Sequence, residues 1–272
     1  MTTSIRPLNA GELLDRTFFL YRKHFALFVG IVAVPNLVLL AAQILGISLR
    51  IGARGGVLIS ILWSLAIAIL YLAVMATSQA GTIIGVSRVH LELPTSLAQV
   101  FSSVRGRIVE ISLLTIGMGI GIGMGFVLFV IPGIVLTLMW ALTVPVAVLE
   151  EKGLRDSVSR SAELTKGQRG RIFVIYVLFF VLTYTVYMLW EMPILMVIGA
   201  FSKGAHVVVP AWTQLAFALG SFLSQSLVSP LLTIALSLAY YDARVRKEAF
   251  DLQLMMSNLD GEQEGIATAT TV

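Results

Sequence analysis

The chain has 272 residues, of which 57% are apolar and 12% carry a charge. A typical soluble domain is about 45–50% apolar and about 25% charged, so this chain lacks the charge that a water-exposed surface needs. The same composition excludes a disordered chain. Because cysteine is absent, disulfides and thiolate metal sites are excluded as well. A polytopic membrane protein remains.

The first predicted element is a short amphipathic helix after Asn9, with Glu12 three residues on in the spacing of a capping box. Apolar stretches follow that are long enough to cross about 30 Å of hydrocarbon as helices. The six predicted spans cover residues 25–46, 57–77, 108–130, 133–149, 172–190 and 215–240. The stretch 193–210 extends the fifth helix or lies in the outer interface, and we favour an interfacial excursion.

A weak internal repeat organises these spans. Each pair is preceded by a short amphipathic helix that ends in basic residues; the second begins at Ser96, with Gln99 in capping-box spacing, and the third at Gly153. The sequence therefore predicts an all-α fold of six transmembrane helices arranged as three hairpins, each preceded by a cytoplasmic interfacial helix. Residues 1–256 form this domain, and 257–272 are predicted to be a disordered polar tail.

The basic residues set the orientation. Of the 19 lysines and arginines, the predicted spans place all but Arg50, Arg54 and Lys203 on one side. Because positively charged loops stay in the cytoplasm, this asymmetry predicts a multi-pass protein of the inner, cytoplasmic membrane with both termini in the cytoplasm. The first apolar run lacks a small-residue cleavage pattern, so we expect it to be retained as a span.

Small residues recur along the third span. The glycines that we expect to face a neighbouring helix are Gly117, Gly121 and Gly125. Their spacing of four places them on one helix face, where they let another backbone approach closely. A flexible or gating helix is the alternative interpretation, since glycine weakens a helix.

Proline falls inside three of the spans. The residues predicted to kink their helices are Pro35, Pro145 and Pro230. Broken helices can also form a solute site near the middle of the membrane, although a static kink is the more frequent outcome.

Polar residues in the spans are few. We interpret Glu110 and Glu191 as interfacial carboxylates, and we expect Gln43, Gln79 and Gln225 to form hydrogen bonds between helices. The three histidines are dispersed, and no catalytic motif is found. The sequence predicts no catalytic residues, no metal or cofactor site and no nucleic-acid partner.

The basic segment 152–171 is the best candidate for binding. The side chains expected to contact anionic lipid or the membrane interface are Arg155, Arg160, Lys166, Arg169 and Arg171. Each positive charge near the inner leaflet contributes about 1 kcal/mol of attraction to anionic lipid. The same charges also serve to fix the topology, and the sequence does not separate the two roles. Membrane lipids are therefore the expected partners, with another protein or a second copy of this chain as a further candidate.

Four stretches resemble a known family. They are residues 8–25, 131–153, 156–173 and 237–252. The positions matching the family pattern are Pro132-Gly133, Pro145, Glu150, Arg160-Ser161, Tyr241, Asp242 and Arg244. The chain resembles bacterial and archaeal integral membrane proteins similar to the membrane domain of glycerophosphoryl diester phosphodiesterases. The resemblance implies a stand-alone membrane domain, without the soluble barrel that carries the hydrolase activity.

Two functions follow from these patterns. The first is a non-enzymatic inner-membrane scaffold or lipid-organising factor, indicated by the basic amphipathic helices. The alternative is a permease for a small apolar or lipid-like solute, indicated by Pro35, Pro230 and the glycine-rich helix. A solvent-accessible cavity that reaches Gln43 and Gln225 would favour the permease, and a dry, closed core would argue against it.

Overall fold

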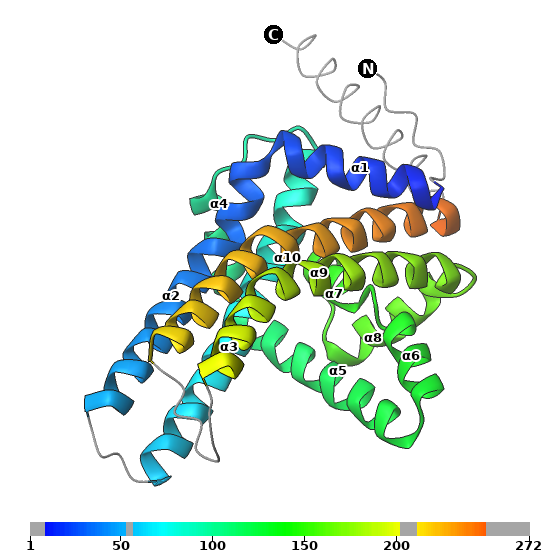
Figure 1. Ribbon diagram of the computed structural model, residues 1–272. Coiled ribbons are helices and arrows are strands. Elements are labelled where there is room, and N and C mark those ends of the chain that lie inside the picture. Colours follow the sequence, from blue (N-terminus) through cyan, green and yellow to red (C-terminus); the bar gives the residue numbers. More distant parts are fainter. Residues whose placement is uncertain (1–8, 53–56, 202–210, 249–272) are drawn as a thin grey trace, which may run out of the picture.

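A computed structural model describes residues 9–52, 57–201 and 211–248, and every element in these ranges is helical (Figure 1). The helices are α1 (Ala10–Lys23), α2 (Phe25–Gly52), α3 (Val57–His90), α4 (Leu97–Arg105), α5 (Ile108–Leu128), α6 (Val130–Met139), α7 (Thr143–Leu149), α8 (Leu154–Thr165), α9 (Arg169–Phe201) and α10 (Ala211–Glu248). Six segments of the described chain are long and apolar enough to span a membrane, as predicted.

Several helices are longer than the sequence predicted. The second span continues through α3 to His90, and α9 reaches Phe201 with Pro193 inside it. The prediction of an interfacial excursion is thus wrong for residues 193–201, and the rest of that stretch lies outside the described residues. Helix α10 continues without a break to Glu248, beyond the predicted end of the sixth span at residue 240. The apolar length of a segment predicts only the part of a helix that lies in lipid. The helix itself continues for as long as its backbone hydrogen bonds do, so it can extend beyond the apolar part.

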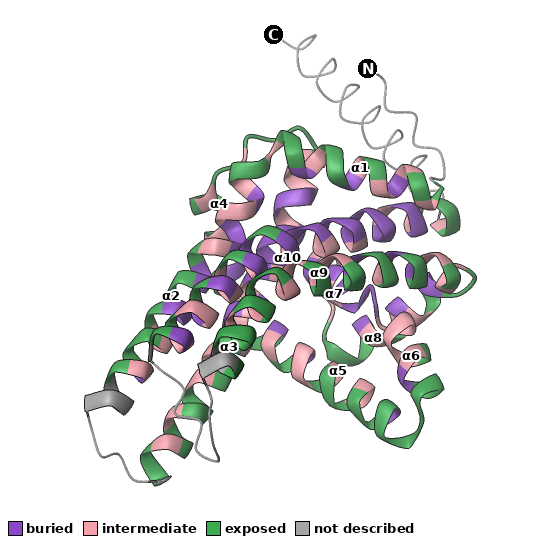
Figure 2. Cartoon of the chain, in the orientation of Figure 1, coloured by how far each residue is buried: buried purple, intermediate pink, exposed green. Residues whose placement is uncertain are grey.

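Helix α10 lies at the centre of the molecule. In its most apolar 18-residue window 61% of the residues are buried, against 6% in α3. Figure 2 shows this burial along α10, while the outward faces of α2, α3 and α5 are exposed. The core forms where α1, α2, α9 and α10 meet, around the fully buried side chains of Leu13, Phe28, Phe179 and Tyr240. Exposed apolar faces are expected for helices whose solvent is lipid.

Both predicted capping motifs are present. The backbone N–H of Asn9 donates to the carboxylate of Glu12 at 2.9 Å, and the backbone N–H of Ser96 donates to Gln99 Oε1 at 3.1 Å. Each bond satisfies a backbone donor where a helix begins. We call the end of the molecule with α1, α4 and the C-terminal turns of α10 the basic end, and the end where α2 finishes and α3 begins the opposite end (Figure 1).

Prolines Pro35 and Pro230 lie inside continuous helices, and a side chain reaches a backbone carbonyl beside each. Asn36 donates from Nδ2 to the carbonyl oxygen of Val32 at 2.8 Å. The hydroxyl of Tyr21, on α1, donates to the carbonyl oxygen of Leu227 at 2.8 Å. These bonds supply donors where proline disturbs the helical ladder. Burial raises the pKa of Tyr21 to about 12, which keeps its hydroxyl protonated.

The fourth span is broken, and not at the predicted place. Helix α6 ends at Met139 and α7 begins at Thr143, so Pro145 lies in the first turn of α7 and does not kink a continuous helix. Proline has no N–H to donate, and its ring clashes with the carbonyl four residues earlier. In the first turn of a helix the missing N–H costs nothing, because a backbone N–H there has no helical partner. The carbonyl four residues earlier lies before the helix begins, so the ring does not disturb the helix either. The chain therefore breaks before Pro145, at residues 140–142.

Candidate functional site

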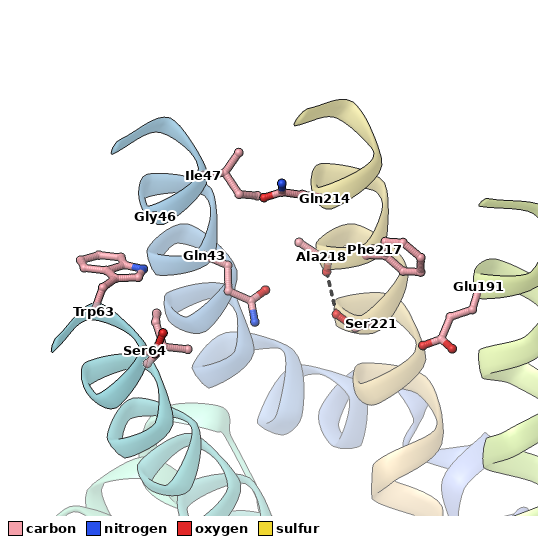
Figure 3. A pocket seen from close by; sticks show the side chains of 11 residues that line it. Gln43, Gly46, Ile47, Trp63, Ser64, Glu191, Gln214, Phe217, Ala218 and Ser221 are labelled. Atoms are coloured by element: carbon pink, nitrogen blue, oxygen red, sulfur yellow. Dashed lines mark hydrogen bonds between the residues drawn. The ribbon is translucent and has the colours of Figure 1, made fainter. Parts of the chain in front are cut away.

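A cavity of about 520 Å³ lies near the opposite end of the molecule, among α2, α3, α9 and α10 (Figure 3). Its described lining residues are Gln43, Gly46, Ile47, Trp63, Ser64, Ile67, Glu191, Gln214, Phe217, Ala218 and Ser221. Most of the wall is apolar. The amides of Gln43 and Gln214 and the hydroxyl of Ser221, from α2 and α10, line the same space (Figure 3). Such a wall, apolar with a few converging polar groups, is typical of a small-molecule site.

A second cavity of about 200 Å³ adjoins the first on the side toward the middle of the spans. The two share Gln43, Ala218 and Ser221 in their walls, and Asn36 and Gln225 line the deeper one. Gln225 donates from Nε2 to the hydroxyl oxygen of Tyr187, on α9, at 2.8 Å, which is the bond between helices expected for this glutamine. Polar side chains therefore line adjoining cavities from Gln43 to Gln225. The sequence analysis named a cavity that reaches these two glutamines as the feature that would favour a permease.

Small residues let the walls of this site approach each other. A Cβ atom on Gly46 would lie 2.2 Å from Nε1 of Trp63, so only glycine allows the indole to pack against α2. On the other side, a Cβ atom on Gly220 would lie 3.2 Å from Cβ of Trp190. These two contacts set the spacing of α2 from α3 and of α10 from α9 at the cavity. The sequence analysis did not single out either glycine.

The glycines of the third span lie against α6 and α8. A Cβ atom on Gly121 would come within 2.5 Å of the Trp140 ring, and one on Gly125 within 3.1 Å of Cα of Gly133. A Cβ atom on Gly117 would be in ordinary contact, 3.7 Å from Leu154. Gly119 and Gly123, on the other face, have nothing within 4 Å.

A third cavity, of about 310 Å³, lies between this helix pair and α9 and α10. Its polar lining residues are Gln79, Thr115, Thr137, Trp140, Tyr176 and Thr233. It shares no lining residue with the other two cavities. Because Trp140 lines this cavity and also packs against Gly121, the break in the fourth span forms part of the cavity wall.

Charged side chains at the basic end connect three helices. Glu150 pairs with Lys152 at 2.7 Å and with Arg160 of α8 at 3.4 Å, and it accepts a hydrogen bond from the hydroxyl of Tyr240 at 2.9 Å. Arg160 also pairs with Glu248 of α10. Burial of Glu150 acts to raise its pKa, but the bonds from Lys152 and Tyr240 and the charge of Arg160 outweigh it, so the pKa is lowered. Its stabilising effect is present above the ordinary glutamate pKa and is lost as the pH falls through the lowered value.

A second group of charges surrounds Asp242. Its side chain is 2% exposed and pairs with Arg171 of α9 and, at 2.8 Å, with Arg246 of α10. Of the five basic residues predicted to contact lipid, Arg160 and Arg171 therefore lie in ion pairs within the chain. Arg155 and Lys166 are exposed and Arg169 is half-buried.

Arg107, which the sequence analysis counted only as a topology charge, binds the end of α7. It donates from Nη2 to the carbonyl oxygen of Ala147 at 2.9 Å, and from Nη1 to that of Val148 at 3.4 Å. A cation at a helix C-terminus stabilises the unpaired carbonyls there. Arg107 and the carbonyls that it binds are about forty residues apart in the sequence, so no local pattern predicts this contact.

Ser161 bridges the break in the fourth span. Its hydroxyl donates to the carbonyl oxygen of Met139 at 2.8 Å and accepts from the backbone N–H of Leu142 at 3.1 Å. Met139 ends α6 and Leu142 precedes α7, so one buried hydroxyl satisfies backbone groups on both sides of the break. The helical spacing of Leu154, Val158, Ala162 and Thr165 predicts that they share one face of α8. The residues of α8 that are buried are Ser157, Ser161, Leu164 and Thr165.

Replacing Ser161 by alanine is expected to destabilise the protein by about 1–3 kcal/mol, because it leaves the buried N–H of Leu142 without this acceptor. The carbonyl oxygen of Met139 also loses its shorter hydrogen bond and keeps the one from the Thr165 hydroxyl at 3.3 Å. The measurement is the apparent unfolding temperature in detergent micelles, followed by tryptophan fluorescence. Ser159, exposed on the same helix, provides the control, and Ser159→Ala should have an effect within about 0.5 kcal/mol. Equal effects at the two positions would show that the bridging bonds are not important for stability.

No group of three or more His, Asp or Glu side chains that could hold a metal ion occurs in the described ranges. The described linings of the two adjoining cavities contain one carboxylate, Glu191, and otherwise amide, hydroxyl and apolar groups. The arrangement can bind an amphiphilic molecule by burial and hydrogen bonding.

Comparison with known proteins agrees with this architecture. The family model described as the membrane domain of glycerophosphoryl diester phosphodiesterase matches residues 108–254, which is more than half of the chain. No curated protein and no solved structure matches the chain. The match covers α5 to α10, including the broken span and both groups of ion pairs, and it concerns the membrane domain, not the catalytic one. The chain therefore belongs to the family of the membrane domain of glycerophosphoryl diester phosphodiesterase.

Proposed function

We propose that this chain is a non-enzymatic permease that binds a small apolar or lipid-like solute in the two adjoining cavities among α2, α3, α9 and α10. The observation that carries the proposal is that these cavities share Gln43 in their walls and that the deeper one reaches Gln225. A purely structural bundle would fill this space with side chains, since protein interiors are close-packed. The combined volume of about 700 Å³ lies within the usual range for small-molecule sites, about 300–1,000 Å³.

The basic end faces the cytoplasm in this proposal, and the larger cavity faces the outer side. The arginines of α4, α8 and the last turns of α10 support this orientation, since basic segments near the spans remain in the cytoplasm. The short helices α1, α4 and α8 then lie at the inner membrane interface, each before a pair of spanning segments. Solute would enter from the outer side, near Gln43 and Ser221, and move inward toward Gln225.

Saturable binding of a small amphiphile tests the proposal. The probe is 1-naphthylmethanol, which is uncharged and has twelve non-hydrogen atoms. It is measured by equilibrium dialysis against the purified protein in nanodiscs, with empty nanodiscs as the reference. Ser221 lines both cavities, so Ser221→Trp should fill the shared space and weaken binding at least tenfold.

Leu223→Trp is the matched control for this experiment. It adds the same side chain two residues away on α10, where Leu223 is 40% exposed and lines none of the three cavities described above. Binding by this variant should equal that of the wild type. Absence of saturable binding to the wild type, or equal binding by the two variants, would reject the permease.

A membrane scaffold or lipid-organising factor is the second candidate, supported by the surface of α8. Leu154 is 48% exposed, and Arg155 and Lys166 are exposed on the same short helix or directly after it. An apolar side chain beside basic ones is typical of a helix that lies on an anionic bilayer.

Changing Arg155, Lys166 and Arg169 together to glutamine should weaken retention of anionic lipid, because about 1 kcal/mol of attraction is lost per charge. Native mass spectrometry of the purified protein measures how much phosphatidylglycerol stays bound relative to phosphatidylcholine. Arg160 and Arg171 are left unchanged, since their ion pairs hold α8 and α9 against α10. Unchanged retention in the triple variant would exclude this surface as the lipid contact.

A further inference from the structure

Glu191 is the one charged residue among the described residues that line the larger cavity. It comes from α9 and is half-buried, and Figure 3 shows its side chain directed toward the α10 part of the wall, where Ser221 lies. Among the described residues, no lysine, arginine or histidine nitrogen lies within 4.0 Å of its carboxylate. A carboxylate at the edge of a membrane span is costly unless a cation or solvent compensates it.

The other polar groups of this cavity are neutral. Gln43, Ser64 and Gln214 supply amides and a hydroxyl, which bind donors and acceptors alike. Ile47, Phe217 and Trp63 supply apolar and aromatic surface. Among the described lining residues, Glu191 alone carries a charge, and it favours a positive group of the solute over a negative one.

Resting on the proposed function, we propose that the solute is an amphiphilic cation: an apolar body that carries a protonated amine, whose ammonium group pairs with the carboxylate of Glu191. The apolar body lies along Phe217 and Ile47, and the neighbouring hydroxyl of Ser221 can accept a remaining ammonium hydrogen. Ammonium is a donor with no acceptor capacity, so it matches a carboxylate and a hydroxyl oxygen. Solutes with a phosphate or carboxylate head are disfavoured by like-charge repulsion at Glu191.

Three probes of the same size and ring system test this assignment. They are 1-naphthylmethylamine, protonated at pH 7, the uncharged 1-naphthylmethanol, and 1-naphthoate, which is negative at pH 7. Equilibrium dialysis against the wild-type protein in nanodiscs of zwitterionic lipid should give a dissociation constant at least tenfold lower for the amine than for the alcohol. The naphthoate should bind most weakly of the three.

Glu191→Gln should remove this preference and keep the cavity. The amine is then expected to bind within about twofold of the alcohol, while the affinity for the alcohol is unchanged from the wild type. The retained alcohol binding also shows that the variant is folded. Glu110→Gln is the matched control, because Glu110 is an exposed carboxylate of another span that pairs with Arg107 and lines none of these cavities. It should leave the preference for the amine intact.

Two results overturn the cation assignment while the permease stands. One is equal binding of amine and alcohol to the wild type, both blocked by Ser221→Trp, whether or not a preference then emerges in Lys203→Gln or Arg50→Gln. The other is a preference for the amine that survives in Glu191→Gln. If the alcohol does not bind saturably to the wild type, the proposed function itself fails.

Discussion

Asp242→Ala is expected to destabilise the protein by about 3–5 kcal/mol, the largest effect of any single change considered for this chain. The carboxylate is 2% exposed, and its removal takes the partner from Arg171, whose side chain is only 14% exposed. A buried charge without its partner is strongly destabilising, because the Coulomb attraction is lost while the desolvation remains. The apparent unfolding temperature in micelles, followed by tryptophan fluorescence, measures the loss.

Two comparisons make this prediction specific to the buried charge. Glu163→Ala removes a 67% exposed carboxylate that is 3.7 Å from Arg160, and it should cost less than about 1 kcal/mol. Removing both partners, in Asp242→Leu with Arg171→Met, should recover part of the loss, because apolar pairs often replace buried ion pairs without penalty. A double variant less stable than Asp242→Ala alone would contradict the explanation.

Gly121→Leu is expected to destabilise the protein by about 1–3 kcal/mol through overpacking. Even the first added atom would lie 2.5 Å from the ring of Trp140, and the ring is held at the end of α6 beside the bridged break. Moving Trp140 also changes the wall of the 310 Å³ cavity. The same unfolding measurement applies, and the proportion of folded protein after purification provides a second readout.

The same helix provides the control for this change. Gly123 lies two residues further along α5 and has no atom within 4 Å of the position of an added Cβ. Gly123→Leu should be neutral or stabilising by up to about 1 kcal/mol, because leucine has a higher helix propensity than glycine. Similar losses at both positions would mean that glycine is needed for flexibility, as in the gating alternative, and not for packing.

Which charged residues form ion pairs was not predictable from the sequence. Arg160 and Arg171 look like their neighbours Arg155 and Arg169 in a basic segment, and charge counting assigns them all to topology or lipid. Folding brings α10 beside α8 and α9, so that Glu248 and Asp242 meet two of these arginines and not the others. The family positions Glu150, Arg160, Asp242 and Arg244 all take part in these pairs. The ion pairs that join different helices follow only from the way in which the helices pack.

The amino-acid sequence by itself determined the lipid environment through its charge deficit, the six spans through their apolar length and the capping motifs through local spacing. The distribution of its basic residues gives the orientation that we propose. These properties depend on composition, hydrophobic length and local spacing, which the sequence carries directly. Tertiary structure decided where the fourth span breaks, which arginines are paired and where a cavity forms. The cavity near Gln43 and Glu191 arises where α2 and α3 meet α9 and α10, which are distant from them in sequence, with spacing set partly by Gly46 and Gly220. Contacts of that kind depend on how helices pack against one another, and no local periodicity specifies them.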